Sequence, residues 1–169
     1  MARTNNYLIQ AMQAKQRFLT YDQNRLIQKL QLPHDGNHLY VTLLDLVCDS
    51  KENRHLTGAW KNMTDFGLMF HRKLLETEKD PWAEKFQAQP EAFRSACEAL
   101  GGISFPQGDI AYAIELFDGL SILVQLWFGD EEFPACLRFL WDENALMYIK
   151  YETMYFAKGL LLQEIEKRM

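Results

Sequence analysis

Three consecutive acidic residues stand out as side chains that could do chemistry. Asp130, Glu131 and Glu132 follow an apolar segment that ends in Trp127 and Phe128. Phe133 comes next, and Asp142-Glu143 follow the succeeding apolar segment. If the two apolar segments pair as strands, Asp142 could lie near the start of the acidic loop. Convergent carboxylates beside aromatic rings can bind a hard cation or act as general acid and base.

The same residues also have an ordinary structural interpretation. Connections between strands are polar by default, and an acidic residue after a strand often caps the turn or helix that follows. Asp142, which precedes Asn144-Ala145-Leu146, fits such a cap. Tryptophans can line a flat-ligand pocket, although they are more often core or interface anchors. The site hypothesis is a ligand- or partner-binding surface, with no catalytic residue or metal ligand assigned: Trp127, Asp130, Glu131, Glu132, Trp141 and Asp142.

Other motifs do not identify a reaction. His34 and His38 have the spacing of two ligands on one helical face, but Pro33 and Gly36 disfavour a helix there. No pair of cysteines has the spacing of a zinc ribbon or an iron–sulfur cluster. The sequence contains no phosphate-binding glycine loop, no Gly-x-Ser-x-Gly elbow and no His-Glu-x-x-His motif. Enzymatic activity and cofactor therefore remain undetermined.

Composition narrows the classes of protein and partner. The chain has 169 residues, is 48% hydrophobic and carries a net charge of −5, which predicts one globular domain over residues 1–169. The negative charge disfavours nucleic acid as a partner. No apolar run is long enough to span a membrane, and the N-terminus lacks the apolar core of a signal peptide, so we expect a cytoplasmic protein. Three widely spaced cysteines predict reduced thiols.

Alternating apolar side chains predict the elements that position the acidic residues. Residues 110–117 and 120–128 alternate and are joined by Asp118-Gly119, a two-residue hairpin signal. Residues 136–141 alternate again and supply a third strand. The sequence therefore predicts a three-stranded antiparallel meander.

Helical periodicity and helix-start signals surround this meander. We predict helices over residues 5–18, 22–31, 38–49 and 64–76, and a loop over 50–66. Asp80-Pro81 and Gln89-Pro90 each begin a further helix, Gly101-Gly102 ends the second of these, and a final helix covers 151–167. The predicted fold class is α+β, with N-terminal helices, the meander and a C-terminal helix.

The chain resembles a bacterial family catalogued as domain of unknown function 3786. The resemblance covers roughly residues 40–165 and rests on separated stretches in the same order: LVCDSKENRHLTGAWKNM, ACEALGG and VQLWFGDEEFPACLRFLWDENALMYIKYETMYFAKGLLLQ. It implies no reaction. Some relatives are joined to iron–sulfur domains, which implies anaerobic cofactor or one-carbon metabolism, although this chain lacks the cysteine cluster of those domains.

Three functional hypotheses follow. The first is a noncatalytic binding or accessory module whose partner is a protein or a small molecule. The alternative is a small metal-dependent enzyme that uses the acidic cluster. In the third, the aromatic surface is the interface of a homo-oligomer.

Overall fold

The computed structural model describes residues 50–66 and 80–169. The described residues fall into two compact units. The small unit has residues 50–55 and 146–160, and the sheet unit has residues 56–66, 80–145 and 161–169. The helices predicted over 5–18, 22–31 and 38–49, most of the helix predicted over 64–76, and the His34/His38 pair lie outside the described residues.

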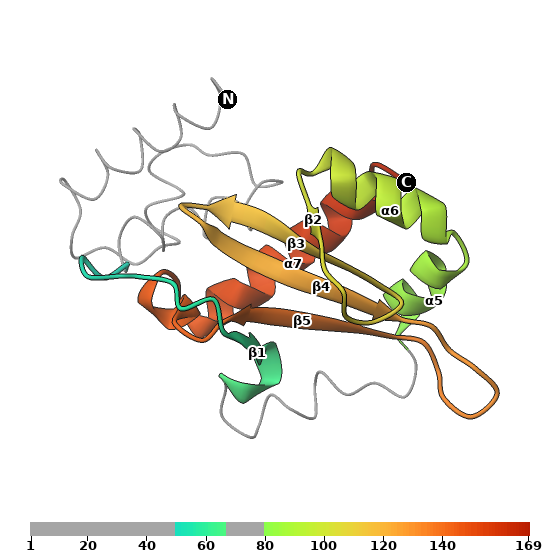
Figure 1. Cartoon of the computed structure of the whole chain (residues 1–169), viewed down its shortest axis with the longest axis horizontal. Coiled ribbons are helices and arrows are strands. Elements are labelled where there is room, and N and C mark those ends of the chain that lie inside the picture. The colour runs from blue at the N-terminus through green and yellow to red at the C-terminus, as the bar shows by residue number, and fades with distance from the viewer. Residues whose placement is uncertain (1–49, 67–79) are drawn as a thin grey trace, which may run out of the picture. The chain divides into compact units, whose positions relative to one another are not determined.

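The sheet unit is built on a five-stranded, fully antiparallel sheet (Figure 1). The strand order is β1-β5-β4-β3-β2. The bounds are Trp60–Asn62 for β1, Ile103–Ser104 for β2, Ile110–Phe117 for β3, Leu120–Trp127 for β4 and Cys136–Asp142 for β5. The predicted meander is confirmed as β3-β4-β5. The prediction of three strands was wrong because β1 and β2 are too short to show alternation, and the first of them lies inside the predicted loop.

A tight turn sets the register of the central hairpin. Asp118 and Gly119 both have positive φ, 50° and 81°, as expected for the turn that matches the twist of two antiparallel strands. The resulting register pairs Ile122 with Ile114. Directly opposed residues share a face of the sheet, so the large apolar side chains that alternate along β3 and β4, such as Ile114 and Ile122, lie on one side.

Two short helices follow the predicted start signals. Helix α5 spans Pro81–Gln87, and the Asp80 Oδ1 atom accepts hydrogen bonds from the first free amides, Trp82 N at 3.0 Å and Ala83 N at 3.2 Å. Helix α6 spans Pro90–Ala99 and ends before Gly101, which has φ of +78°. Both predicted helices are confirmed.

The core of the sheet unit lies between these helices and one face of the sheet. Phe86 of α5 and Phe93 of α6 are fully buried and stack with ring centroids 4.8 Å apart. The Tyr112 hydroxyl of β3 donates to Glu98 Oε1 of α6 at 2.9 Å. The sheet residues that share this face and are buried are Ile110, Tyr112, Ile114, Leu120, Ile122, Val124, Leu126, Phe139 and Trp141.

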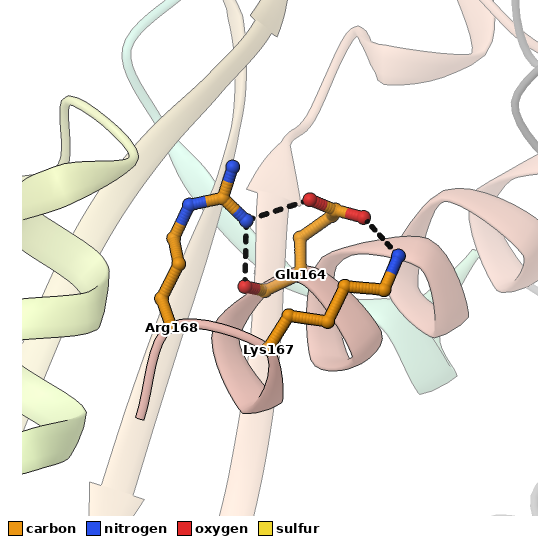
Figure 2. A network of polar contacts seen from close by, with 3 residues as sticks. All are labelled: Glu164, Lys167 and Arg168. Carbon is orange, nitrogen blue, oxygen red and sulfur yellow. Dashed lines mark hydrogen bonds and ion pairs between the residues drawn. The ribbon is translucent and has the colours of Figure 1, made fainter.

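The final helix, α7, spans Tyr151–Glu166, and its predicted inward residues Met154, Ala157, Leu161 and Ile165 are all buried. Its last turn carries a small ionic network (Figure 2). Glu164 accepts from Lys167 Nζ at 2.7 Å and from Arg168 Nη1 at 2.6 Å, and these two bonds hold the pKa of Glu164 below its usual range. In the described part of the chain, no helix is long and apolar enough to cross a membrane.

Candidate functional site

The strand register separates Asp142 from the acidic loop. Trp127 pairs with Cys136 at the end of the β4–β5 hairpin from which the loop departs. Asp142 is the last residue of β5, so it lies at the other end of the hairpin, roughly 20 Å along the strand from Cys136. The expectation that Asp142 lies near the loop was wrong, because the loop joins the start of β5 whereas Asp142 ends it.

Trp127 and Trp141 are also apart, on opposite faces of the sheet. Trp141 pairs with Ile122, and Trp127 lies five positions further along β4, so strand alternation turns the two indoles to opposite sides. Trp141 is fully buried in the core, where its indole N–H has no acceptor among the described residues. Trp127 remains 38% exposed. The two tryptophans therefore cannot line one pocket.

Asp142 has a structural role at the edge of the sheet. Its Oδ2 atom accepts from Gly58 N at 2.7 Å and from Thr57 N at 2.9 Å, and its Oδ1 atom accepts from Asn144 N at 2.9 Å. These bonds join the segment before β1 to the end of β5 and begin the turn before the 3-10 helix η3, Ala145–Met147. Both carboxylate oxygens are committed to backbone amides, which matches the capping interpretation of the sequence.

Asp130 shapes the loop in which it lies. Its Oδ1 atom accepts from Glu132 N and Phe133 N, both at 2.8 Å, and its own N–H donates to the Phe133 carbonyl oxygen at 2.8 Å. The backbone amides of Phe133 and Glu132 hold the pKa of Asp130 below its usual range, since they stabilise the ionised carboxylate. Asp130 therefore closes a tight turn at the tip of the connection.

Neighbouring elements fix both ends of the same connection. Phe128 N donates to Asp109 Oδ2 at 2.7 Å, and Gly129 N donates to Gln87 Oε1 at 2.9 Å. A side chain at Gly129 would meet Ala135 N at 2.6 Å, so only glycine fits without displacement of the backbone. The connection is thus held by Asp109, which precedes β3, by Gln87 of α5 and by its own turn.

Two neighbours lie close to Trp127 at the base of the connection. The Arg138 guanidinium lies 5.5 Å from the centre of the Trp127 ring system, within the range of a cation–π contact. A Cβ atom at Gly108 would lie 3.5 Å from the indole, and Gly108 has φ of +78°, which favours glycine. The indole therefore lies close to Arg138 and to the Gly108 backbone, with part of its surface open to solvent.

We name residues 127–134 the aromatic–acidic loop. In Figure 1 its orange trace extends beyond the end of the sheet. Phe133 is 67% exposed and Phe128 is 41% exposed, so with Trp127 three large aromatic side chains face solvent within seven residues. Glu131 and Glu132 are exposed beside them, and neither forms a salt bridge with the described residues. The structure thus brings together Trp127, Asp130, Glu131 and Glu132 of the six predicted residues.

The described residues offer no metal centre. Within residues 50–66 and 80–169, no group of three or more His, Cys, Asp or Glu side chains is placed to hold a metal ion. Asp130 directs one oxygen to its own turn, and Asp142 lies at the opposite end of the hairpin. The geometry gives no support to the metal-dependent alternative.

Sequence reasoning missed the residues that hold the aromatic–acidic loop in place: Gln87, Gly108, Asp109 and Arg138. The Gly108-Asp109 pair directly before a predicted strand was an available turn signal. Alternation turns Arg138 away from the face of Leu137 and Phe139. The strand pairing was needed to show that Arg138 lies on the same face as Trp127 and contacts its indole.

The family model described as domain of unknown function (DUF3786) matches residues 3–164. This chain belongs to the DUF3786 family. The resemblance seen in the sequence is thereby confirmed. No curated protein and no solved structure matches this chain. Membership of DUF3786 supplies no reaction, so the function of this DUF3786 chain has to be argued from its own surface.

Proposed function

We propose that this protein is a noncatalytic binding or accessory module and that the aromatic–acidic loop is its binding surface. The observation that carries the proposal is the exposure of Trp127, Phe128 and Phe133 on one short, fixed connection. Large aromatic residues are enriched at protein interfaces and among the residues that contribute most to binding. Exposed apolar patches on soluble proteins commonly mark such sites.

The hydrogen bonds that fix the backbone of the loop also favour binding. A loop that is already fixed loses little conformational entropy when a partner binds. Asp109 and Gln87 anchor its beginning and Asp130 closes its tip, while none of these contacts buries the Phe133 ring. The hydrogen bonds hold the backbone and leave the aromatic side chains available. Such an arrangement suits docking better than it suits chemistry on a small substrate.

The metabolic setting is inferred from the resemblance alone. DUF3786 relatives joined to iron–sulfur domains point to anaerobic cofactor or one-carbon metabolism. In that setting the module would act as an accessory protein in the cytoplasm. The test below does not depend on this setting.

Site-specific crosslinking in the native cell tests the binding surface. A photoreactive benzoylphenylalanine replaces Phe133 and, in a matched control, Ile103, which is 70% exposed on the edge strand β2. We expect one or a few discrete adducts from position 133 and none of the same mass from position 103. The yield of the adducts should fall when Phe128 is changed to Ser, because that ring belongs to the same surface.

Two results would contradict the proposal. Position 133 could give no adduct, or it could give the same adducts as position 103. Either outcome would show that the aromatic–acidic loop contacts no partner of its own.

A further inference from the structure

We propose that the occupant of the aromatic–acidic loop is a short basic segment of another protein that carries an apolar anchor residue. This inference rests on the proposed function and adds the chemistry of the partner. It follows from the area of the exposed patch, from the charges around it and from a contact already present within the chain.

The area of the patch fits a short segment. From the exposed fractions of Trp127, Phe128 and Phe133, the three rings offer roughly 300 Å². A stable protein dimer buries about 800 Å² on each partner. The patch therefore has the size of an anchor point, which a peptide-like segment can cover, and falls short of the interface of a permanent dimer.

The charges around the patch select a cationic partner. Glu131 and Glu132 are exposed and form no salt bridge with the described residues, and the nearby Asp130 carboxylate is ionised at neutral pH. Lysine or arginine side chains of a partner would meet these carboxylates at the rim while an apolar side chain covers the phenyl rings. Complementary charge of this kind steers association and discriminates against acidic partners.

A contact within the chain shows that this surface accepts a guanidinium group. Arg138 lies over the Trp127 ring at 5.5 Å from its centre. The Phe128 and Phe133 rings present the same kind of π-face and have no aromatic stacking or cation–π partner in the described part of the chain. Arginine or lysine from a partner can occupy them in the same way.

A second copy of this chain is a poorer occupant. The chain carries a net charge of −5, so two copies repel each other, and the aromatic–acidic loop would face an equally acidic loop in a twofold pair. Nucleic acid is disfavoured by the same charges. The basic protein segment is the occupant that satisfies both the aromatic rings and the carboxylates.

Selection from random peptides tests whether the bound segment is basic and carries an apolar anchor, without presupposing its sequence. Phage-displayed random 16-residue peptides are selected on the purified full chain and counter-selected on the Phe133→Ser variant, which changes no charge. We expect the enriched peptides to carry several lysines or arginines together with an aromatic residue or leucine. Their Kd values are then measured by fluorescence anisotropy.

Two single charge reversals provide the matched comparison. Glu132→Lys should weaken binding of the enriched peptides about ten-fold. Glu143→Lys makes the same change in net charge at the opposite end of β5 and should alter the Kd less than two-fold. Raising the salt concentration from 0.05 to 0.5 M should also weaken binding, because exposed charges are screened.

Several outcomes would overturn the inference. Enriched peptides that are neutral or acidic would contradict the proposal of a basic partner. The proposed function would still stand if crosslinking at position 133 had succeeded. Failure to enrich any peptide dependent on Phe133, or equal effects of Glu132→Lys and Glu143→Lys, would also overturn it. A dimer in light scattering that Phe133→Ser dissociates would make a second copy the occupant.

Discussion

At the scale of single residues, several aspartates hold the backbone of this protein, whereas the two glutamates of the aromatic–acidic loop do not. Asp80, Asp109, Asp130 and Asp142 each accept hydrogen bonds from backbone amides at the ends of elements. Glu131 and Glu132 in the aromatic–acidic loop accept none from the described residues. The short aspartate side chain reaches nearby backbone amides more readily than glutamate does. The capping interpretation of Asp142 in the sequence rests on this property, and the hydrogen bonds of Asp142 agree with it.

Replacing Asp142 tests that assignment. Asp142→Asn keeps one acceptor but turns an NH₂ group toward backbone amides of Thr57, Gly58 or Asn144. Because the residue is buried, we expect a loss of about 1–3 kcal/mol in the free energy of unfolding, measured by urea denaturation. Glu143→Gln, an exposed neighbour, should change it by less than about 0.5 kcal/mol. Unchanged stability in Asp142→Asn would leave its hydrogen bonds without structural importance.

The Asp130 turn should depend on pH. Its folded pKa is lowered by the Phe133 and Glu132 amides, so the turn is stabilised above the unfolded pKa and this contribution is lost as pH falls below about 4. A carbon-13 NMR titration of the Asp130 carboxyl group should give a midpoint below that of free aspartate. A midpoint at or above the free value would contradict the observed hydrogen bonds.

The two described cysteines should differ in reactivity. Burial raises the pKa of Cys97 to about 12, so almost none of it is thiolate at pH 8, whereas Cys136 is half-buried beside the aromatic–acidic loop. Native protein treated with iodoacetamide at pH 8 should be alkylated at Cys136 about a hundred-fold faster than at Cys97. Mass spectrometry after cleavage at glutamate separates the two sites. Equal rates would mean that Cys97 is accessible.

At the scale of elements, the sequence was sufficient wherever several local signals agreed. The Asp118-Gly119 turn lay between two alternating segments, and Pro81 and Pro90 marked helix starts, so β3, β4, α5 and α6 were all predicted. Strands β1 and β2 were missed because two or three residues show no period. They exist through pairing with β5 and β3, which are distant in sequence.

Two glycine substitutions contrast a turn with a helix. Gly119 has φ of +81°, and an added Cβ would lie 3.1 Å from Leu56 Cδ1, so Gly119→Ala should cost about 1 kcal/mol or more. Gly159 lies inside α7 with no atom within 4 Å of an added Cβ, so Gly159→Ala should stabilise the protein by up to about 1 kcal/mol. Thermal denaturation of both variants shows whether each substitution lowers or raises the stability of the protein. A Gly119→Ala variant that is stabilised, as Gly159→Ala should be, would contradict the turn geometry.

At the scale of the whole molecule, the candidate site was predicted in part. The order of residues between two predicted strands placed the acidic and aromatic side chains in one loop. The structure keeps Trp127, Asp130, Glu131 and Glu132 together. Trp141 and Asp142 were assigned to the same site because the segments 120–128 and 136–141 were expected to pair, but the length of the strand between the loop and Asp142 was not considered. An antiparallel register sends the end of β5 away from the loop, and alternation turns Trp141 into the core. Both facts follow from the predicted antiparallel pairing and alternation, and the structure adds the register that pairs Trp127 with Cys136 and Ile122 with Trp141.

Stability and binding should therefore be separable in this protein. Phe93 is fully buried and stacks on Phe86, so Phe93→Ala should cost about 3–5 kcal/mol in the free energy of unfolding. Phe133 is 67% exposed, so Phe133→Ser should cost less than about 0.5 kcal/mol. Urea denaturation of the two variants measures both values. A large loss in Phe133→Ser would show that the ring supports the fold. A small one would leave an exposed aromatic side chain that the fold does not need, which is the property expected of a residue retained for a partner.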